Sequence, residues 1–65
     1  MPEIVVYAVE GRTLDQKRAL MQDITAATVK HFKVEPEAVV VQIVESAQHN
    51  KAKGGVLFSE RAAKK

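Results

Sequence analysis

Proline occupies position 2 of this chain, directly after Met1 and before a strand-like run. Aminopeptidases commonly remove an initiator methionine that precedes proline, and removal here would turn the Pro2 nitrogen from an amide into a free secondary amine. An α-amino group has a reference pKa of roughly 7.7–8.0, and burial in an apolar pocket lowers that pKa because desolvation disfavours the charged form. Pro2 is therefore a candidate general base near neutral pH. The alternative is that proline only blunts the start of an edge strand.

Arg12 is the second candidate, because it stands in a bend between the first strand-like run and a helical segment. A guanidinium group binds a carboxylate through two parallel hydrogen bonds, so an arginine here could clamp an acidic substrate. An ordinary surface arginine is the alternative, and spacing alone favours neither.

Other combinations of reactive residues are weaker. The chain has no cysteine, and His31 and His49 fall on a predicted helix and a predicted loop, so no Cys-His or Ser-His-Asp set is expected. Glu45 and His49 are four residues apart, but the region lacks a helical pattern and further ligands, so no metal site is predicted. The Gly54-Gly55 pair lacks the other residues of a phosphate loop and predicts a hairpin turn.

Length and composition predict one small domain spanning residues 1–65. The chain has a formal charge of +2, a pI near 9.2 and 46% hydrophobic residues. Ordering it costs on the order of 100 kcal/mol, and a monomer of this size buries too little surface to offset that cost comfortably. We therefore expect an oligomer. No apolar run is long enough to span a membrane and the N-terminal region does not resemble a signal peptide, so we expect a cytoplasmic protein without membrane contact.

Positive charge gathers near the C-terminus. Between Ala47 and Lys65 the single acid Glu60 stands against five basic residues, which are Lys51, Lys53, Arg61, Lys64 and Lys65. Nucleic-acid binding would require a denser basic patch with stacking aromatics. The chain has only three aromatic residues, so we expect a solvated tail or a pocket for anionic ligands, and no nucleic-acid partner.

The pattern along the chain predicts strand, helix, strand and hairpin. Ile4–Val9 is apolar on both faces, which is typical of a strand in a sheet covered on both sides. A capping box at Thr13–Gln16 begins a helix that runs from Leu14 to about Phe32. Val39–Val44 is a second strand, and Val56–Phe58 could form a short third strand or a hairpin arm. The predicted inner stripe of the helix comprises Leu20, Met21, Ile24, Ala27, Thr28, His31 and Phe32.

Strand, helix and strand form one βαβ unit with parallel strands. One helix on two strands leaves a sheet face and both sheet edges uncovered. The element pattern thus predicts an oligomer independently of chain length.

A larger pattern joins these features. Pro2 and a strand are followed by Glu10-Gly11-Arg12-Thr13 with Asp15-Gln16-Lys17, a helix, a valine-rich strand and the Gly-Gly turn. The pattern resembles the tautomerase superfamily, and most of all its short 4-oxalocrotonate tautomerase group. The resemblance covers nearly the whole chain up to about Phe58, and the E-G-R-T-x-D-Q-K stretch paired with Pro2 is its most specific part.

The resemblance implies an α+β fold, a single β-α-β unit with a C-terminal hairpin that packs against neighbouring protomers, assembled as a homohexamer. It implies a cofactor-independent isomerase that moves a proton within small unsaturated 2-hydroxy or 2-oxo acids, as in the degradation of aromatic compounds. Pro2 matches the position of the family's catalytic base, and Arg12 matches the arginine that holds a substrate carboxylate. A small carboxylate is the implied ligand, without metal or organic cofactor.

Two positions depart from the family pattern. Val40 stands where a second arginine is typical, which weakens the expectation of a dicarboxylate substrate. Lys51 stands where an aromatic residue is common, so the pocket would be wetter and would lower the proline pKa less. We hypothesise that Lys51 or Lys53 supplies a replacement cation. Phe58 is a candidate for the missing aromatic, although a hairpin phenylalanine more often packs in an interface.

Two other functions compete with isomerisation. Proline-dependent hydration, dehalogenation or decarboxylation would need a water-activating carboxylate, for which Glu10 or Glu45 can be nominated. A non-catalytic oligomeric scaffold or ligand-binding protein would keep the fold without the second arginine. Retention of Met1 would favour the scaffold, because it blocks the amine.

Overall fold

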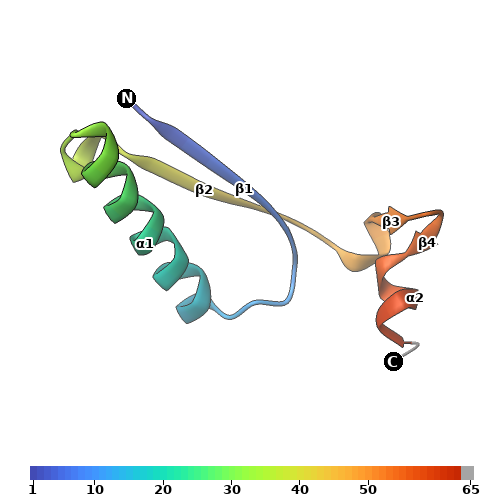
Figure 1. Cartoon of the computed structure of the whole chain (residues 1–65). Coiled ribbons are helices and arrows are strands. Elements are labelled where there is room, and N and C mark those ends of the chain that lie inside the picture. The colour runs from blue at the N-terminus through green and yellow to red at the C-terminus, as the bar shows by residue number, and fades with distance from the viewer. Residues whose placement is uncertain (64–65) are drawn as a thin grey trace.

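Two parallel strands and one long helix form the larger part of the molecule (Figure 1). The computed structural model describes the backbone of residues 1–63 and side chains as far as residue 61, so the basic Lys64 and Lys65 lie outside the described residues. Strand β1 spans Glu3–Val9, helix α1 spans Leu14–Phe32 and strand β2 spans Val40–Ser46. The predicted strand–helix–strand order is confirmed.

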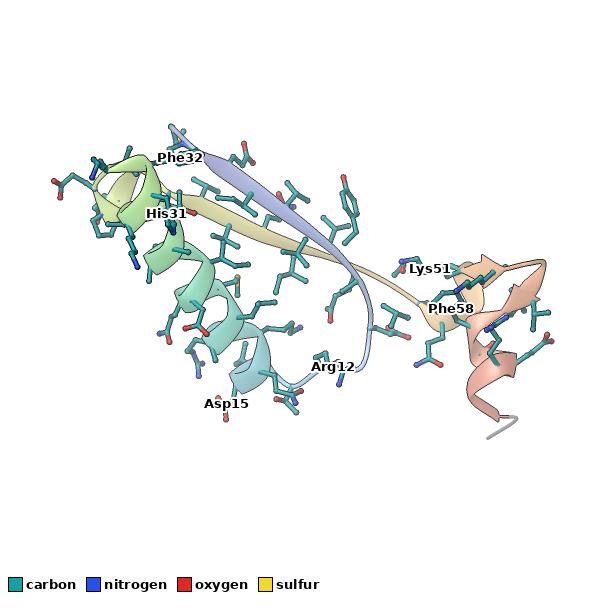
Figure 2. All side chains as sticks on the ribbon, viewed as in Figure 1. Arg12, Asp15, His31, Phe32, Lys51 and Phe58 are labelled. Atoms are coloured by element: carbon teal, nitrogen blue, oxygen red, sulfur yellow. The ribbon has the colours of Figure 1, made fainter. Side chains whose placement is uncertain are left out.

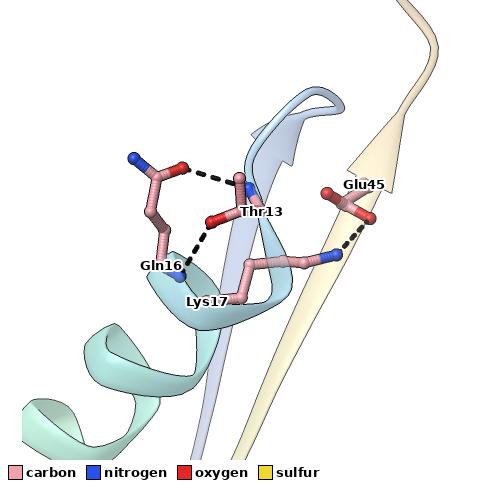
Figure 3. A network of polar contacts seen from close by, with 4 residues as sticks. All are labelled: Thr13, Gln16, Lys17 and Glu45. Carbon is pink, nitrogen blue, oxygen red and sulfur yellow. Dashed lines mark hydrogen bonds and ion pairs between the residues drawn. The ribbon is translucent and has the colours of Figure 1, made fainter.

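Helix α1 begins and ends at well-formed caps. The Thr13 hydroxyl accepts a hydrogen bond from the Gln16 amide at 3.1 Å, and the Gln16 side-chain oxygen accepts one from the Thr13 amide at 3.0 Å (Figure 3). At the other end Lys33 adopts the left-handed conformation, with φ 56°, and its amide donates to the Val29 carbonyl at 2.9 Å. These reciprocal bonds satisfy orphan backbone groups, and they explain why the predicted capping box located the start of the helix correctly.

The sheet presents one face to α1 and leaves the other open. Strands β1 and β2 pair in parallel with Glu3 opposite Val40 and Tyr7 opposite Val44. Successive strand residues point to opposite faces. Ile4, Val6 and Ala8 in β1 alternate with exposed neighbours, and Val41 and Ile43 do the same in β2. The prediction of a sheet covered on both sides therefore fails within a single chain, whereas the predicted open face and open edges are present.

The open face carries apolar side chains. Its exposed members include Val5, Val40 and Val44, with Tyr7 the most exposed of them at 76% of its surface. We call Val5, Tyr7, Val40 and Val44 the outer sheet face.

The buried side of α1 differs from the predicted stripe. Its half-buried residues are Lys17, Met21, Ile24, Thr25, Thr28 and Val29. Four residues of the predicted stripe are exposed, so their prediction as inward-facing residues is wrong for the single chain: Leu20, Ala27, His31 and Phe32. A sheet of two strands is too narrow to cover a wide apolar helix face, which leaves Phe32 67% exposed.

Residues 47–63 form a C-terminal arm that projects away from the βαβ unit (Figure 1). After the 3₁₀ turn η1 at Pro36–Ala38 and strand β2, a second 3₁₀ turn η2 spans Gln48–Asn50. Strands β3 and β4, at Ala52–Lys53 and Val56–Leu57, then form an antiparallel hairpin.

The hairpin turn consists of Gly54 and Gly55, whose φ angles of 61° and 81° favour glycine. The predicted hairpin is confirmed, but Phe58 is not part of a third strand. It begins a short helix, α2 at Phe58–Ala63, which the sequence analysis did not predict.

Residues 1–61 of the isolated chain contain no buried hydrophobic core. Among the described residues none is buried, and the molecule extends 44 × 22 × 15 Å. Its radius of gyration is 15.2 Å, whereas a compact domain of this length would have about 11 Å. This chain is therefore shaped to bury its apolar surface against other chains. In residues 1–63 no helix has both the length and the hydropathy needed to cross a bilayer.

Candidate active site

Pro2 lies at the beginning of the sheet, half-buried, immediately before β1. Its carbonyl accepts a hydrogen bond from the Val40 amide at 3.0 Å, which ties it to the first residue of β2. Met1 is 89% exposed and projects from this end of the sheet. Removal of Met1 would therefore cost little packing and would leave the Pro2 amine on an ordered strand end.

Val40 is the β2 residue next to Pro2, and its side chain is 38% exposed. An arginine at this position would have placed a cation beside the proline. The chain offers a valine instead, so any second cation must come from elsewhere.

Arg12 lies at the opposite end of β1 from Pro2. The strand has seven residues, which corresponds to about 23 Å at about 3.3 Å per residue. Gly11, with φ 126°, turns the chain after the strand, and Arg12 then precedes α1 (Figure 2). One copy of the chain therefore does not bring Pro2 and Arg12 together.

A pocket between α1 and the sheet opens beside Arg12. Its lining combines four apolar residues with four polar ones: Val6, Ala8, Leu20, Ile43, Arg12, Gln16, Lys17 and Glu45. The Lys17 ammonium pairs with Glu45 across this pocket at 3.1 Å (Figure 3). Arg12 is exposed, and no carboxylate of residues 1–61 lies within ion-pair distance of it. Arg12 is thus the lining cation that remains available to an outside anion.

The ion pair of Lys17 and Glu45 was not predicted from the sequence. Lys17 lies in the first turn of α1 and Glu45 near the end of β2, so only the parallel return of the chain brings them together. This ion pair also makes Glu45 a weaker candidate for a water-activating group, because its carboxylate is already paired with the Lys17 ammonium.

Lys51 and Phe58 lie together in the C-terminal arm (Figure 2). The Lys51 ammonium stands 5.9 Å from the centre of the Phe58 ring. Lys53 is exposed in β3, and its carbonyl accepts a bond from Arg61 at 3.3 Å. The arm thus carries cations at a third location, separate from Pro2 and from Arg12.

The two histidines stay apart, as predicted. His31 lies in the last turn of α1 and His49 in η2. Over residues 1–61 no three side chains of the histidine, cysteine, aspartate or glutamate type form a metal-binding group.

Sequence comparison connects this geometry to known proteins. A family model described as "Tautomerase enzyme" matches residues 2–61. A protein of Bradyrhizobium diazoefficiens named "Probable tautomerase" is 54% identical over 63 residues, covering 97% of this chain and 94% of the relative. A "Probable tautomerase" of Bacillus cereus is 38% identical over 61 residues, covering 94% of this chain and 100% of the relative.

Solved structures show the same fold. One from a study of the 4-oxalocrotonate tautomerase isozymes of Methylibium petroleiphilum matches with a TM-score of 0.88 and 33% identity, over 98% of this chain and 100% of that one. A heterohexameric 4-oxalocrotonate tautomerase from Chloroflexus aurantiacus matches with a TM-score of 0.83 and 28% identity, over 92% of this chain and 97% of that one.

The β-α-β unit with a short C-terminal hairpin is the fold of solved 4-oxalocrotonate tautomerases, one of which is a heterohexamer. The chain belongs to the tautomerase family and is a tautomerase of the 4-oxalocrotonate type.

Proposed function

We propose that this tautomerase isomerises small unsaturated 2-hydroxy and 2-oxo acids, with Pro2 as the general base once Met1 has been removed. The placement of Pro2 is the main support for this proposal. Pro2 is half-buried and its carbonyl is hydrogen-bonded to β2, whereas Met1 before it is 89% exposed. An aminopeptidase can reach such a methionine, and the freed amine would stay fixed on the strand end.

In the proposed reaction the Pro2 amine accepts the proton of the 2-hydroxyl group. The oxygen's electron pair forms the carbonyl, the carbon–carbon double bond shifts, and the prolinium returns the proton to carbon. Arg12 holds the substrate carboxylate through paired hydrogen bonds and draws electron density toward it. The proton is returned by the group that took it, so no cofactor is required.

The proposed site is shared between copies of the chain. Pro2 and Arg12 lie at opposite ends of β1, about 23 Å apart along the strand. A substrate that touches both must therefore bind where two copies meet. We propose a homo-oligomer, and a hexamer in particular, in which the outer sheet face and the C-terminal arm make the contacts.

Lys51 is the proposed replacement for the missing arginine. Val40 supplies no charge beside Pro2, whereas Lys51 is half-buried, and no carboxylate of residues 1–61 lies within ion-pair distance of it. We assign Lys51 of another copy to the second anionic group of the substrate. We also expect the enzyme to work in the cytoplasm, in the breakdown of aromatic compounds.

The test is ketonisation of 2-hydroxymuconate and phenylenolpyruvate by protein whose N-terminus has been verified by mass. Pro2→Leu should lower kcat/KM by at least about 100-fold, because a large residue at position 2 keeps Met1 on the chain and leaves only an amide there, and a positioned general base contributes about 10²–10⁴-fold. Pro36→Leu is the matched control, because Pro36 begins η1 at an exposed position. Full activity in Pro2→Leu would remove the proposed base, and Met1 retained in the native protein would support a scaffold instead.

A further inference from the structure

The C-terminal hairpin pairs a lysine with an aromatic ring. Ala52 pairs with Leu57 and Lys53 with Val56, so Lys51 and Phe58 are the next opposed pair of the same hairpin. The Phe58 amide donates to the Lys51 carbonyl at 2.8 Å, which extends the ladder by one bond. This bond holds Lys51 and Phe58 opposite each other, just beyond the last paired residues of β3 and β4.

The Lys51 ammonium lies over the Phe58 ring. It stands 5.9 Å from the ring centre, near the outer limit of a cation–π interaction. Both residues are half-buried, and a half-buried lysine can lay its stem on apolar surface while its ammonium stays in water. Lys53 is exposed, and within the described chain its ammonium lies over no aromatic ring.

The Phe58 ring restricts the movement of the Lys51 ammonium but does not neutralise its charge. A carboxylate partner would cancel the charge, as Glu45 does for Lys17, but residues 1–61 place none within ion-pair distance of Lys51. A free lysine loses considerable rotamer entropy when it is fixed in one position. A lysine already held on a ring loses less when an anion binds.

We propose that Phe58 is a positioning residue that holds the Lys51 ammonium in place, and that this pair makes the enzyme select substrates with a second anionic group. This assignment rests on the proposed function, in which Lys51 contacts the end of the substrate remote from Arg12. This chain has Val40 where the family typically has an arginine. The pair of Lys51 and Phe58 would give the enzyme a different way to recognise a dicarboxylate.

Binding of two unreactive probes tests the pair without requiring turnover. Adipate has two carboxylates and hexanoate has one on a chain of the same length, and their Kd values can be measured by NMR titration of the assembled protein. Wild-type protein should prefer adipate. Lys51→Met should lower that preference by at least about tenfold, the loss of one hydrogen bond to a charged group. Phe58→Leu should lower the adipate preference roughly two- to fivefold, which is the contribution of an exposed cation–π contact. Phe58→Tyr should preserve the adipate preference, because tyrosine keeps an aromatic ring.

A double variant separates positioning from a merely structural role. If Phe58 acts through Lys51, the variant carrying both Lys51→Met and Phe58→Leu should match Lys51→Met alone. The proposal would be overturned if the two single variants lowered the adipate preference additively, or if each weakened the binding of adipate and hexanoate equally. It would also be overturned if wild-type protein did not prefer adipate, or if the adipate preference disappeared in Lys53→Met but not in Lys51→Met.

A spectroscopic measurement covers the case in which Phe58→Leu disturbs the fold. The ε-methylene protons of Lys51 should show an upfield ring-current shift in wild-type protein and in Phe58→Tyr, and its absence in both would contradict the pairing. Failure of the proposed function would give a different result: turnover would then survive in Pro2→Leu, which has no amine at position 2, whatever the two probes show.

Discussion

At the residue scale, Arg12 is available to bind an anion because no carboxylate of residues 1–61 lies within ion-pair distance of it. The other basic residues near it have partners: Lys17 pairs with Glu45 at 3.1 Å and Arg18 with Asp15 at 2.8 Å. Arg12 is exposed and stands at the mouth of the pocket between α1 and the sheet. A vacant guanidinium beside apolar walls suits a carboxylate on a short carbon chain.

Replacing Arg12 should therefore weaken carboxylate binding. We expect Arg12→Ala to raise KM for either substrate at least about tenfold, since hydrogen bonds to charged groups contribute about 1.5–3 kcal/mol. Arg12→Lys should recover only part of the loss, because an ammonium cannot form the paired bonds. Arg18→Ala is the control, as Arg18 is exposed and pairs only within α1. Equal effects of Arg12→Ala and Arg18→Ala on KM would show that Arg12 does not contact the substrate.

The Pro2 amine predicts the direction of the pH dependence. A base works only when it is unprotonated, so kcat/KM should fall as pH decreases through the pKa of the free enzyme's amine. Initial rates across a pH series, with substrate ionisation held constant, measure this. A kcat/KM that is independent of pH on the acid side would contradict a proline base.

At the element scale, the caps of α1 position both Arg12 and Lys17. The Thr13 and Gln16 bonds fix the first turn of the helix directly after Arg12. We expect Thr13→Ala to lower the free energy of unfolding by about 1 kcal/mol and Thr13→Ser to be nearly neutral, because a serine hydroxyl caps equally well. Chemical denaturation at a fixed protein concentration measures both variants. Equal stability of Thr13→Ala and wild type would mean that assembly, rather than the capping box, sets the helix start.

Elements with strong local signals were predictable from the sequence. The capping box located Leu14 as the first residue of α1, and the Gly54-Gly55 pair located the hairpin turn. Helix α2 was missed because it follows β4 at Phe58 without a capping residue or a linker. Ala27 and Phe32 were wrongly placed on the inner face because helical periodicity reveals an apolar stripe but not the width of the sheet beneath it.

Most of the candidate site was also visible in the sequence, but its geometry was not. Pro2 and Arg12 were nominated by residue type and position, and Lys51 by its departure from the family pattern, whereas the contacts that these residues make were not predicted. The contact of Lys51 with Phe58 depends on hairpin register, which two glycines alone do not specify. Whether these residues act in catalysis remains a prediction.

At the scale of the whole molecule, no side chain of residues 1–61 is buried, and the outer sheet face leaves Tyr7 76% exposed. Apolar surface of this kind favours association, because covering it with another surface removes it from water. In the proposed assembly, the contacts that cover this surface would also complete the active site.

A charge on the outer sheet face should break the assembly. We expect Tyr7→Lys to shift the protein from an oligomer to smaller species in analytical ultracentrifugation and to abolish turnover, because burying an unpaired charge is costly. Glu37→Lys, at an exposed position of η1, should keep the assembly intact. An unchanged sedimentation profile for Tyr7→Lys would mean that this face lies outside the contacts.

The sharing of one site between copies is tested most directly by mixing two inactive variants. Pro2→Leu, which keeps Met1 on the chain, supplies an intact Arg12 and Arg12→Ala supplies an intact Pro2, so unfolding the two together and refolding them should create some complete sites. Random mixing of equal amounts predicts recovery of about a quarter of wild-type activity when a site draws these residues from two different copies. If mixed assemblies form, as native mass spectrometry can show, and no activity returns, Pro2 and Arg12 do not meet across an interface and the account is wrong.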